Sequence, residues 1–202
     1  MDGRPQLILF DMVGVLVRMR GAPELLAWIE GRLTPAELWR WWIDSPAVVA
    51  FETGRMSGED FAAYAVRELQ LPLSATEFLT TMVAWFDGPF PATRETLAAL
   101  HDRFPLAILS NSNALFYEKL HTMDLLPFFT HTFFSHLTGL LKPARAAFAQ
   151  VIEHTGIPAE KILFFDDNKH NVDAALELGF AARLTRGMAA VREILSDLNL
   201  LL

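Results

Sequence analysis

Short apolar runs that stop abruptly at polar residues constrain the fold of this chain more than any other sequence feature. The runs and the residues that end them are 6–10 with Asp11, 106–109 with Ser110 and Asn111, and 162–165 with Asp166 and Asp167. Continuous apolar runs of this length are typical of strands that are buried on both faces of a parallel sheet. Helical patterns separate the runs, and two more short strands are expected at 132–134 and 180–184. This alternation predicts an α/β fold, a Rossmann-like parallel sheet with helices on both faces.

The polar residues at the strand ends predict where a ligand binds. In open α/β sheets, ligands bind outside the carboxyl ends of the strands. Asp11, Asp166 and Asp167 are expected to meet at that edge. Three neighbouring carboxylates repel one another unless a cation lies between them. Mg²⁺, a hard ion that prefers oxygen ligands, is the expected cofactor.

The segment 18–88 differs from the rest because it shows no comparable strand and carries repeated helix-start signals. Thr34, Ser57 and Ser74 each precede a helical pattern with an acidic residue in its first turn. All five tryptophans lie in this segment, as expected for a small subdomain that needs large side chains to build its own core. We therefore expect a core domain of residues 1–17 and 89–202, with an inserted small helical cap domain at 18–88.

Composition narrows the classes of partner. The 17 basic and 24 acidic residues give a net charge of −7, which is the wrong sign for holding nucleic acid or an anionic membrane by the overall field. The sequence has no cysteine, which excludes thiolate metal sites and a thiol nucleophile. No window has enough apolar residues to span a bilayer, and Asp11 interrupts the one stretch that resembles a signal peptide. We expect a cytoplasmic monomer or homodimer.

Four segments resemble, in order, the motifs of the haloacid dehalogenase (HAD) superfamily. The segments are Leu7–Val15, Ile108–Asn113, Gly139–Pro143 with Phe148 following, and Ile162–Asn168 continuing to Asn171 and Val172. Segment 18–88 is similar to the small helical cap of that superfamily. Within it, Ser110-Asn111, Phe165–Asn168 and Gly54–Ser57 look most like the glucose-1-phosphatase-like branch.

The resemblance implies an activity and residue roles. It implies a Mg²⁺-dependent phosphatase that hydrolyses small phosphorylated metabolites, sugar phosphates above all, through an aspartyl-phosphate. Asp11 would be the nucleophile, while Ser110, the Asn111 backbone N–H and Lys142 would hold the phosphoryl oxygens. The metal ligands would be Asp11, the Val13 carbonyl, Asp166 and Asp167.

Position 13 departs from the family pattern, because Val13 stands where the second Asp of the first motif belongs. That Asp is the general acid and base, and its loss is expected to cost about 10²–10⁴ in rate unless another group replaces it. The backbone carbonyl of Val13 can still serve as a metal ligand. Asp44, Glu52, Glu59 or a metal-held water are the candidates for the missing acid, and the sequence does not rank them.

Three family precedents lack this second Asp. Haloacid dehalogenases carry Tyr there and need no metal, which fits the Asp166-Asp167 pair poorly. Phosphonoacetaldehyde hydrolases need a cap lysine, and segment 18–88 has none. The glucose-1-phosphatase-like branch tolerates a small non-acidic residue and fits best. The rival hypothesis is a catalytically impaired binding protein with the same fold.

Overall fold

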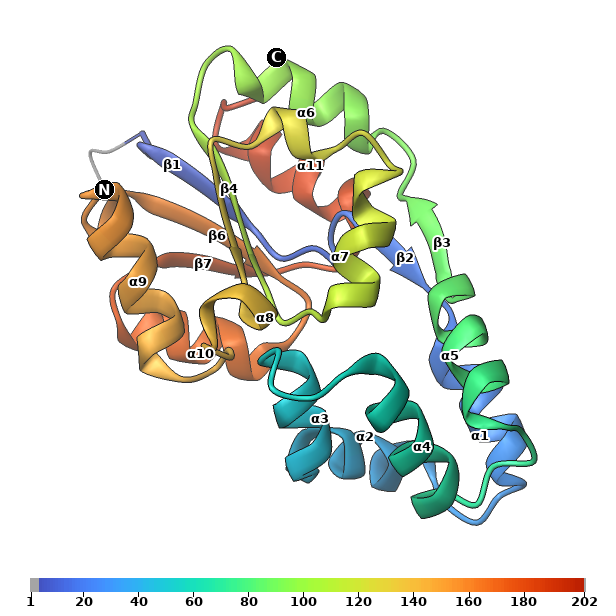
Figure 1. Ribbon diagram of the computed structural model, residues 1–202. Coiled ribbons are helices and arrows are strands. Elements are labelled where there is room, and N and C mark those ends of the chain that lie inside the picture. Colours follow the sequence, from blue (N-terminus) through green and yellow to red (C-terminus); the bar gives the residue numbers. More distant parts are fainter. Residues whose placement is uncertain (1–3, 202) are drawn as a thin grey trace.

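The computed structural model describes residues 4–201, and its centre is a five-stranded parallel sheet in the order β5-β4-β1-β6-β7 (Figure 1). The strands are β1 (Leu7–Phe10), β4 (Leu106–Ser110), β5 (His131–Phe134), β6 (Ile162–Asp166) and β7 (Ala181–Leu184). All five expected strands are confirmed. Strand β1 lies in the middle of the sheet and pairs with β4 on one side and β6 on the other. Its carboxyl end is therefore adjacent to the carboxyl ends of both neighbours.

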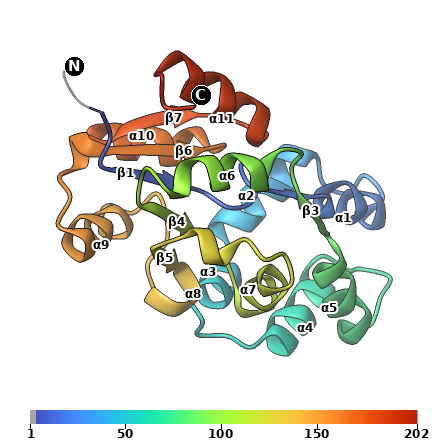
Figure 2. The ribbon, with the colours of Figure 1, turned by 90° about the horizontal axis from the view of Figure 1, so that it is seen from above.

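Side-chain alternation along β1 explains why helices cover both faces of the sheet. Ile8 and Phe10 pack with residues of α6, α7 and α11, whereas Leu7 and Leu9 pack with residues of α9 and α10. These helices are α6 (Thr93–His101), α7 (Ala114–His121), α9 (Arg145–Thr155), α10 (Lys169–Glu177) and α11 (Gly187–Asp197). Figure 1 shows α6 and α11 on one side of the sheet and α9 and α10 on the other, and Figure 2 views the molecule from the α6 side. Since a strand buried on both faces has no polar positions, polar residues are confined to its ends.

Five helices follow β1 before the chain returns to the sheet. They are α1 (Gly21–Ile29), α2 (Pro35–Asp44), α3 (Pro46–Glu52), α4 (Gly58–Glu68) and α5 (Ala75–Ala84). The expected helix starts are confirmed: Thr34 and Ser74 form capping boxes, and the Ser57 hydroxyl accepts a hydrogen bond from the Asp60 N–H. Each cap satisfies backbone N–H groups that the first helical turn leaves free. The exact division between core and cap, at 17/18 and 88/89, remains our prediction.

The structure adds a ribbon that the sequence analysis missed. Strands β2 (Val17–Met19) and β3 (Phe86–Pro89) pair antiparallel where the helical segment leaves and rejoins the core. The Arg18 guanidinium lies 3.7 Å from the Asp87 carboxylate and reinforces this pairing. The two connections to the helical segment therefore form one joint rather than two separate linkers.

The Lys142-Pro143 pair predicts a helix that opens at Pro143, and the structure corrects this prediction. Helix α9 begins at Arg145, after an N-cap at Ala144, so Lys142 does not lie at a helix N-terminus. Its backbone is fixed by Asn111 instead: the Lys142 N–H donates to Asn111 Oδ1 at 2.8 Å, and Asn111 Nδ2 donates to the Lys142 carbonyl at 2.9 Å. Lys142 is therefore held by the loop that follows β4.

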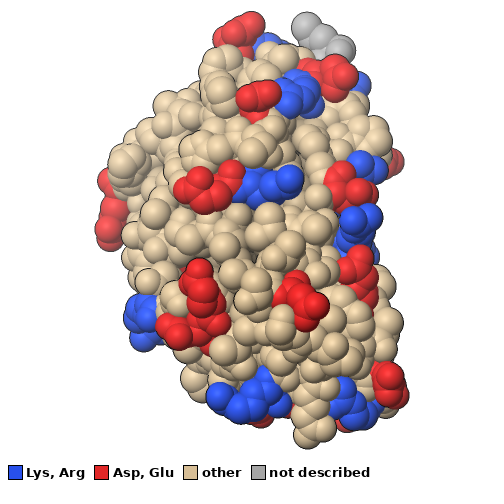
Figure 3. Space-filling model, turned by 45° about the vertical axis from the view of Figure 1, so that its right-hand side comes forward, with Lys and Arg blue, Asp and Glu red and all other residues tan. Residues whose placement is uncertain are grey.

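None of the helices described within residues 4–201 has the length and apolar character needed to cross a membrane. Acidic and basic side chains are interspersed on the face shown in Figure 3, without a broad area of positive charge. That distribution agrees with the negative net charge of the sequence.

Candidate active site

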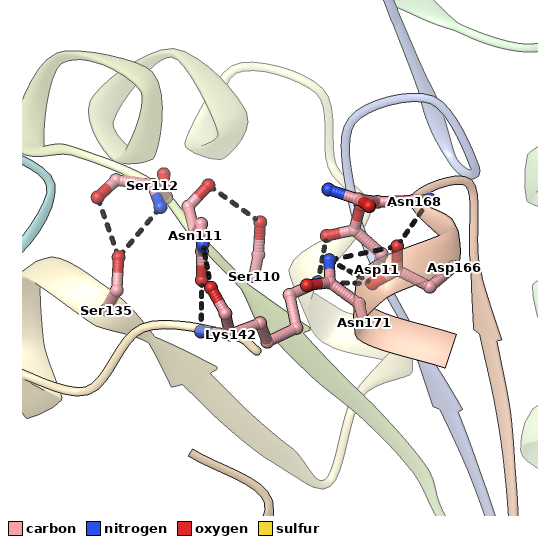
Figure 4. Close-up of polar contacts among 9 residues, drawn as sticks. All are labelled: Asp11, Ser110, Asn111, Ser112, Ser135, Lys142, Asp166, Asn168 and Asn171. Atoms are coloured by element: carbon pink, nitrogen blue, oxygen red, sulfur yellow. Dashed lines mark hydrogen bonds and ion pairs between the residues drawn. The ribbon is translucent and has the colours of Figure 1, made fainter. Parts of the chain in front are cut away.

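Three carboxylates meet at the carboxyl edge of the sheet, as the strand order requires. Asp11 follows β1, Asp166 ends β6 and Asp167 comes next, and each offers an oxygen within 4.8 Å of the other two. Asp11 and Asp166 are buried, while Asp167 is exposed. Figure 4 shows Asp11 and Asp166 converging from neighbouring strands on Lys142.

Lys142 bridges the two buried carboxylates. Its Nζ lies 2.8 Å from Asp11 Oδ1 and 2.7 Å from Asp166 Oδ2, and its side chain is 1% exposed. Burial lowers the pKa of the Lys142 ammonium, but the charges of Asp11 and Asp166 outweigh this effect and leave the pKa raised. Lys142 is therefore a fixed positive charge inside the site.

Asp166 is held on all sides by hydrogen bonds. Besides the contact with Lys142, its Oδ1 accepts from the Asn168 N–H at 2.8 Å, and Asn171 Nδ2 lies 3.1 Å from each carboxylate oxygen. These contacts occupy the sites where a carboxylate accepts hydrogen bonds. Asp166 is thus well placed to hold Lys142 and poorly placed to take a further direct ligand.

The charges of the cluster are incompletely balanced without a cation. Burial raises the pKa of Asp11 to about 7, with Lys142 opposing the shift and Asp166 and Asp167 adding to it. Burial and the charge of Asp166 likewise raise the pKa of Asp167. Three carboxylates and one ammonium leave an excess of negative charge, and oxygen donors suit a hard divalent ion. The residues therefore fit Mg²⁺.

The backbone around Val13 supports the same interpretation. Gly14 has φ +86°, and a Cβ there would lie 2.1 Å from Asp167 Oδ2, so the Asp167 carboxylate rests directly on this loop. The bridge between Val13 and Val17 uses the Met12 carbonyl and the Gly14 N–H. The Val13 carbonyl takes no part in that bridge.

The loop after β4 forms the other side of the site. Ser110 is buried and Asn111 half-buried. The Ser110 hydroxyl is 3.4 Å from the Asn111 carbonyl oxygen, a weak contact that leaves it free to turn. The Asn111 side chain ties this loop to Lys142, as described above. Ser110, Asn111 and Lys142 thus lie beside the carboxylate cluster (Figure 4), and their roles toward a phosphoryl group remain predictions.

Of the three cap acids considered from the sequence, the structure brings Glu52 to the site. Glu52 ends α3 and is half-buried, and the charges of Lys142 and Asp11 act on its carboxyl. Asp44 and Glu59 are exposed. The sequence around Glu52 does not distinguish it from Asp44 and Glu59, although Gly54 allows the close approach of the helical segment and the core.

Several charged and aromatic side chains outside the carboxylate cluster are exposed to solvent. Arg18 and Arg20 are exposed and pair with Asp87 and Glu24. His170 is also exposed. Among the tryptophans, Trp39 is 54% exposed. Asn168 and Asn171 belong to the fourth motif, and the structure shows that they hold Asp166 in place.

The sequence of this chain is similar to that of known proteins. The family model of haloacid dehalogenase-like hydrolases matches residues 5–179. A phosphoglycolate phosphatase of Pseudomonas fluorescens is 27% identical over 191 residues, which cover 87% of this chain and 67% of that protein. Flavin mononucleotide hydrolase 1 of Arabidopsis thaliana is 24% identical over 200 residues, which cover 96% of this chain and 78% of that protein.

Solved structures share the fold at lower sequence identity. A HAD family enzyme of Bacteroides thetaiotaomicron, in complex with magnesium and inorganic phosphate, has a TM-score of 0.74 at 18% identity, over 90% of this chain and 94% of that one. A HAD-like hydrolase of Porphyromonas gingivalis has a TM-score of 0.75 at 22% identity, over 96% and 98% of the two chains. An L-2-haloacid dehalogenase has a TM-score of 0.73 at 22% identity, over 97% and 99%.

Proposed function

Because the chain belongs to the haloacid dehalogenase-like hydrolase family, we propose that it is a Mg²⁺-dependent phosphatase of small phosphate monoesters that acts through an aspartyl-phosphate. The observation that carries this proposal is the cluster of Asp11, Asp166 and Asp167 around the buried Lys142. Such a cluster joins a carboxylate nucleophile, a fixed positive charge and a cation site within a few ångströms.

We assign the cation to Asp11, Asp167 and the Val13 carbonyl, with Asp166 contributing charge and holding Lys142. Asp167 rests against Gly14 beside Val13, whereas Asp166 already accepts four hydrogen bonds. When bound, Mg²⁺ offsets the negative charge of the carboxylates and of the phosphate.

In the first step, an oxygen of Asp11 bonds to phosphorus as the bond from phosphorus to the ester oxygen breaks, and that oxygen leaves as an alcohol after taking one proton. Lys142, Ser110 and the Asn111 N–H stabilise the charge that gathers on the phosphoryl oxygens. In the second step, water bonds to phosphorus and loses a proton, the bond from phosphorus to Asp11 breaks, and inorganic phosphate leaves. The Asp11 carboxylate is then regenerated.

Sugar phosphates come first among the substrates we propose, because the motifs resemble the glucose-1-phosphatase-like branch. The relatives add two further compounds to test, since one is a phosphoglycolate phosphatase and the other a flavin mononucleotide hydrolase. All three are small phosphate monoesters, and the cap would select among them.

Val13 favours a second candidate function, in which the chain binds phosphate and metal without useful turnover. Valine carries no proton, so this function holds unless another residue supplies one. A dehalogenase is disfavoured, because its carboxylate nucleophile would have to work beside two further carboxylates with no metal ion and with Lys142 alone to offset their charge.

The test is hydrolysis of p-nitrophenyl phosphate and of a panel of phosphate monoesters, with Mg²⁺ and with a chelator. We expect hydrolysis by the wild type only when Mg²⁺ is present, and we expect Asp11→Asn to hydrolyse the esters at the background rate. If Asp11→Asn retained activity, Asp11 could not be the nucleophile. Binding of Mg²⁺ and a phosphate mimic such as beryllofluoride without turnover on any ester would favour the second candidate.

A further inference from the structure

The side chain at position 13 cannot move protons, yet hydrolysis of an alkyl phosphate needs one proton delivered and one removed. Helix α3 brings Glu52 to the core side of the helical segment, and Figure 1 shows α3 next to α8 (Ser135–Thr138) of the core. Glu52 therefore lies where the helical segment meets the core.

The backbone of Glu52 is tied to the core by a specific contact. Ser135 Oγ lies 2.6 Å from the Glu52 carbonyl oxygen and 2.9 Å from the Ser112 N–H. Ser112 belongs to the same loop as Ser110 and Asn111. One buried hydroxyl thus connects the end of α3 to the loop that is placed to hold phosphoryl oxygens.

The next turn reinforces this contact. Gly54 has φ +71°, and a Cβ there would lie 2.4 Å from the backbone carbonyl oxygen of His136. Since backbone atoms of the helical segment and the core meet this closely, the position of Glu52 relative to the site is fixed on both sides.

The carboxyl of Glu52 is held by one oxygen. Trp42 Nε1 donates to Glu52 Oε1 at 3.2 Å, and no hydrogen bond recorded among residues 4–201 uses Oε2. Oε2 is therefore available to give or take a proton.

The electrostatic surroundings suit proton transfer near neutral pH. Burial raises the pKa of Glu52 to about 7, opposed by the Trp42 hydrogen bond and by Lys142, with a further upward contribution from Asp11. From α8, the pKa of His136 is lowered by burial, so that ring adds little positive charge nearby. A group with a pKa near the working pH can both donate and accept a proton efficiently.

We propose that Glu52 is the general acid and base that replaces the acid missing at position 13. This inference rests on the proposed phosphatase function. Protonated Glu52 gives its proton to the ester oxygen as the bond from that oxygen to phosphorus breaks. The resulting Glu52 carboxylate then takes a proton from the water that attacks the aspartyl-phosphate, which restores the starting state.

The test compares Glu52→Gln with wild type on an alkyl phosphate and on p-nitrophenyl phosphate. Gln keeps the size of the side chain and can accept the Trp42 hydrogen bond, so the variant should fold, and a cooperative thermal transition checks this. We expect kcat/KM for the alkyl ester to fall about 10²–10⁴-fold. For the aryl ester, whose leaving group needs no proton, kcat/KM should fall far less.

Two further measurements separate a proton-transfer role from a structural one. The decline of kcat/KM for the alkyl ester above about pH 7 should disappear in Glu52→Gln. Adding Val13→Asp to that variant should restore part of the lost activity. Glu59→Gln, which changes an exposed glutamate of the same helical segment, is the matched control and should match wild type.

Equal losses on both esters, or activity of Glu52→Gln equal to that of Glu59→Gln, would overturn the assignment while leaving the phosphatase function intact. Failure of the phosphatase function looks different: wild type would then hydrolyse neither ester with Mg²⁺, and Asp11→Asn would behave like wild type.

Discussion

Replacing Lys142 with Met tests the charge balance of the site. Lys142 is enclosed, with a 1% exposed side chain, and lies within 2.8 Å of Asp11 Oδ1 and 2.7 Å of Asp166 Oδ2. Met has a similar length and no charge, so the substitution removes the ammonium while filling much of the same space. Two buried carboxylates are then left without their counter-charge.

The expected loss of stability in Lys142→Met follows from the burial of its ion pairs rather than from their short distances. Removing one partner of a buried ion pair costs about 3–5 kcal/mol, because the remaining charge stays buried and uncompensated. The pKa of Lys142 is higher in the folded protein than in the unfolded chain. Its contribution to the free energy of unfolding is therefore complete at any pH below the pKa of the unfolded chain, and it is lost only as the pH rises through the pKa of the folded protein. At pH 7.5 the full effect applies, and a loss of this size lowers the melting temperature of a domain this large by about 6–20 °C.

The surface pair of Lys169 and Asp173 supplies the control. Its Nζ–Oδ2 distance is 2.6 Å, yet the two side chains are 71% and 47% exposed. Exposed pairs of this kind contribute about 0.3–0.5 kcal/mol, so Lys169→Met should change stability by no more than that. Urea unfolding of both variants without metal at pH 7.5 measures the difference. A cost for Lys142→Met of below about 1 kcal/mol, equal to that of the control, would refute the reasoning.

Three further substitutions have expected outcomes. Gly14→Ala should weaken Mg²⁺ binding in calorimetric titration more than it weakens the fold, because the new Cβ displaces the Asp167 side chain, which can rotate away. Gly54→Ala should cost about 1–3 kcal/mol in urea unfolding and exceed Gly139→Ala, which has a similar φ but nothing within 4 Å. Protonated Glu52 stabilises the wild-type protein fully below about pH 4.5, and this stabilisation is lost as the pH rises to about 7. Because Gln does not titrate, the free energy of unfolding of Glu52→Gln should rise by about 1–3 kcal/mol relative to wild type between pH 5 and pH 8. Equal losses of stability in Gly54→Ala and Gly139→Ala, or a stability difference at Glu52 that does not change with pH, would contradict these expectations.

The sheet and the meeting of its strand ends could be predicted from the sequence, because both follow from local pattern and general topology. Five apolar runs locate the five strands. Parallel strands place their carboxyl ends at one edge, so Asp11 and Asp166 had to be neighbours once their strands paired. No knowledge of side-chain packing is needed for that step.

The ribbon of β2 and β3 could not be predicted in the same way. Its strands have three and four residues, and β3 contains Asp87, Gly88 and Pro89, which are poor strand formers. The pairing arises from the requirement that the chain leave and re-enter the core at adjacent points. Local preference carries no information about that requirement.

The sequence could not rank the three cap acids for a related reason. Asp44, Glu52 and Glu59 all lie on or near helix ends, and helical periodicity does not reveal how a group of helices is oriented toward the sheet. The orientation is set by long-range contacts, such as the one between Ser135 and Glu52. Which acid faces the carboxylates therefore becomes visible only in three dimensions.

A proton donor carried by α3 has a consequence that a donor at position 13 lacks. A residue of the loop after β1 stays beside the nucleophile whatever the helical segment does, whereas Glu52 is beside it only while the contacts of Ser135 and Gly54 hold. Proton transfer would thus require the helical segment to stay docked on the core through these contacts. Docking also excludes water from the aspartyl-phosphate, except for the molecule that reacts. Substrates too large to let α3 approach α8 would form few productive complexes even where Asp11 reaches their phosphorus. On this view, Val13 shifts control of turnover from the core loop to the fit between substrate and cap.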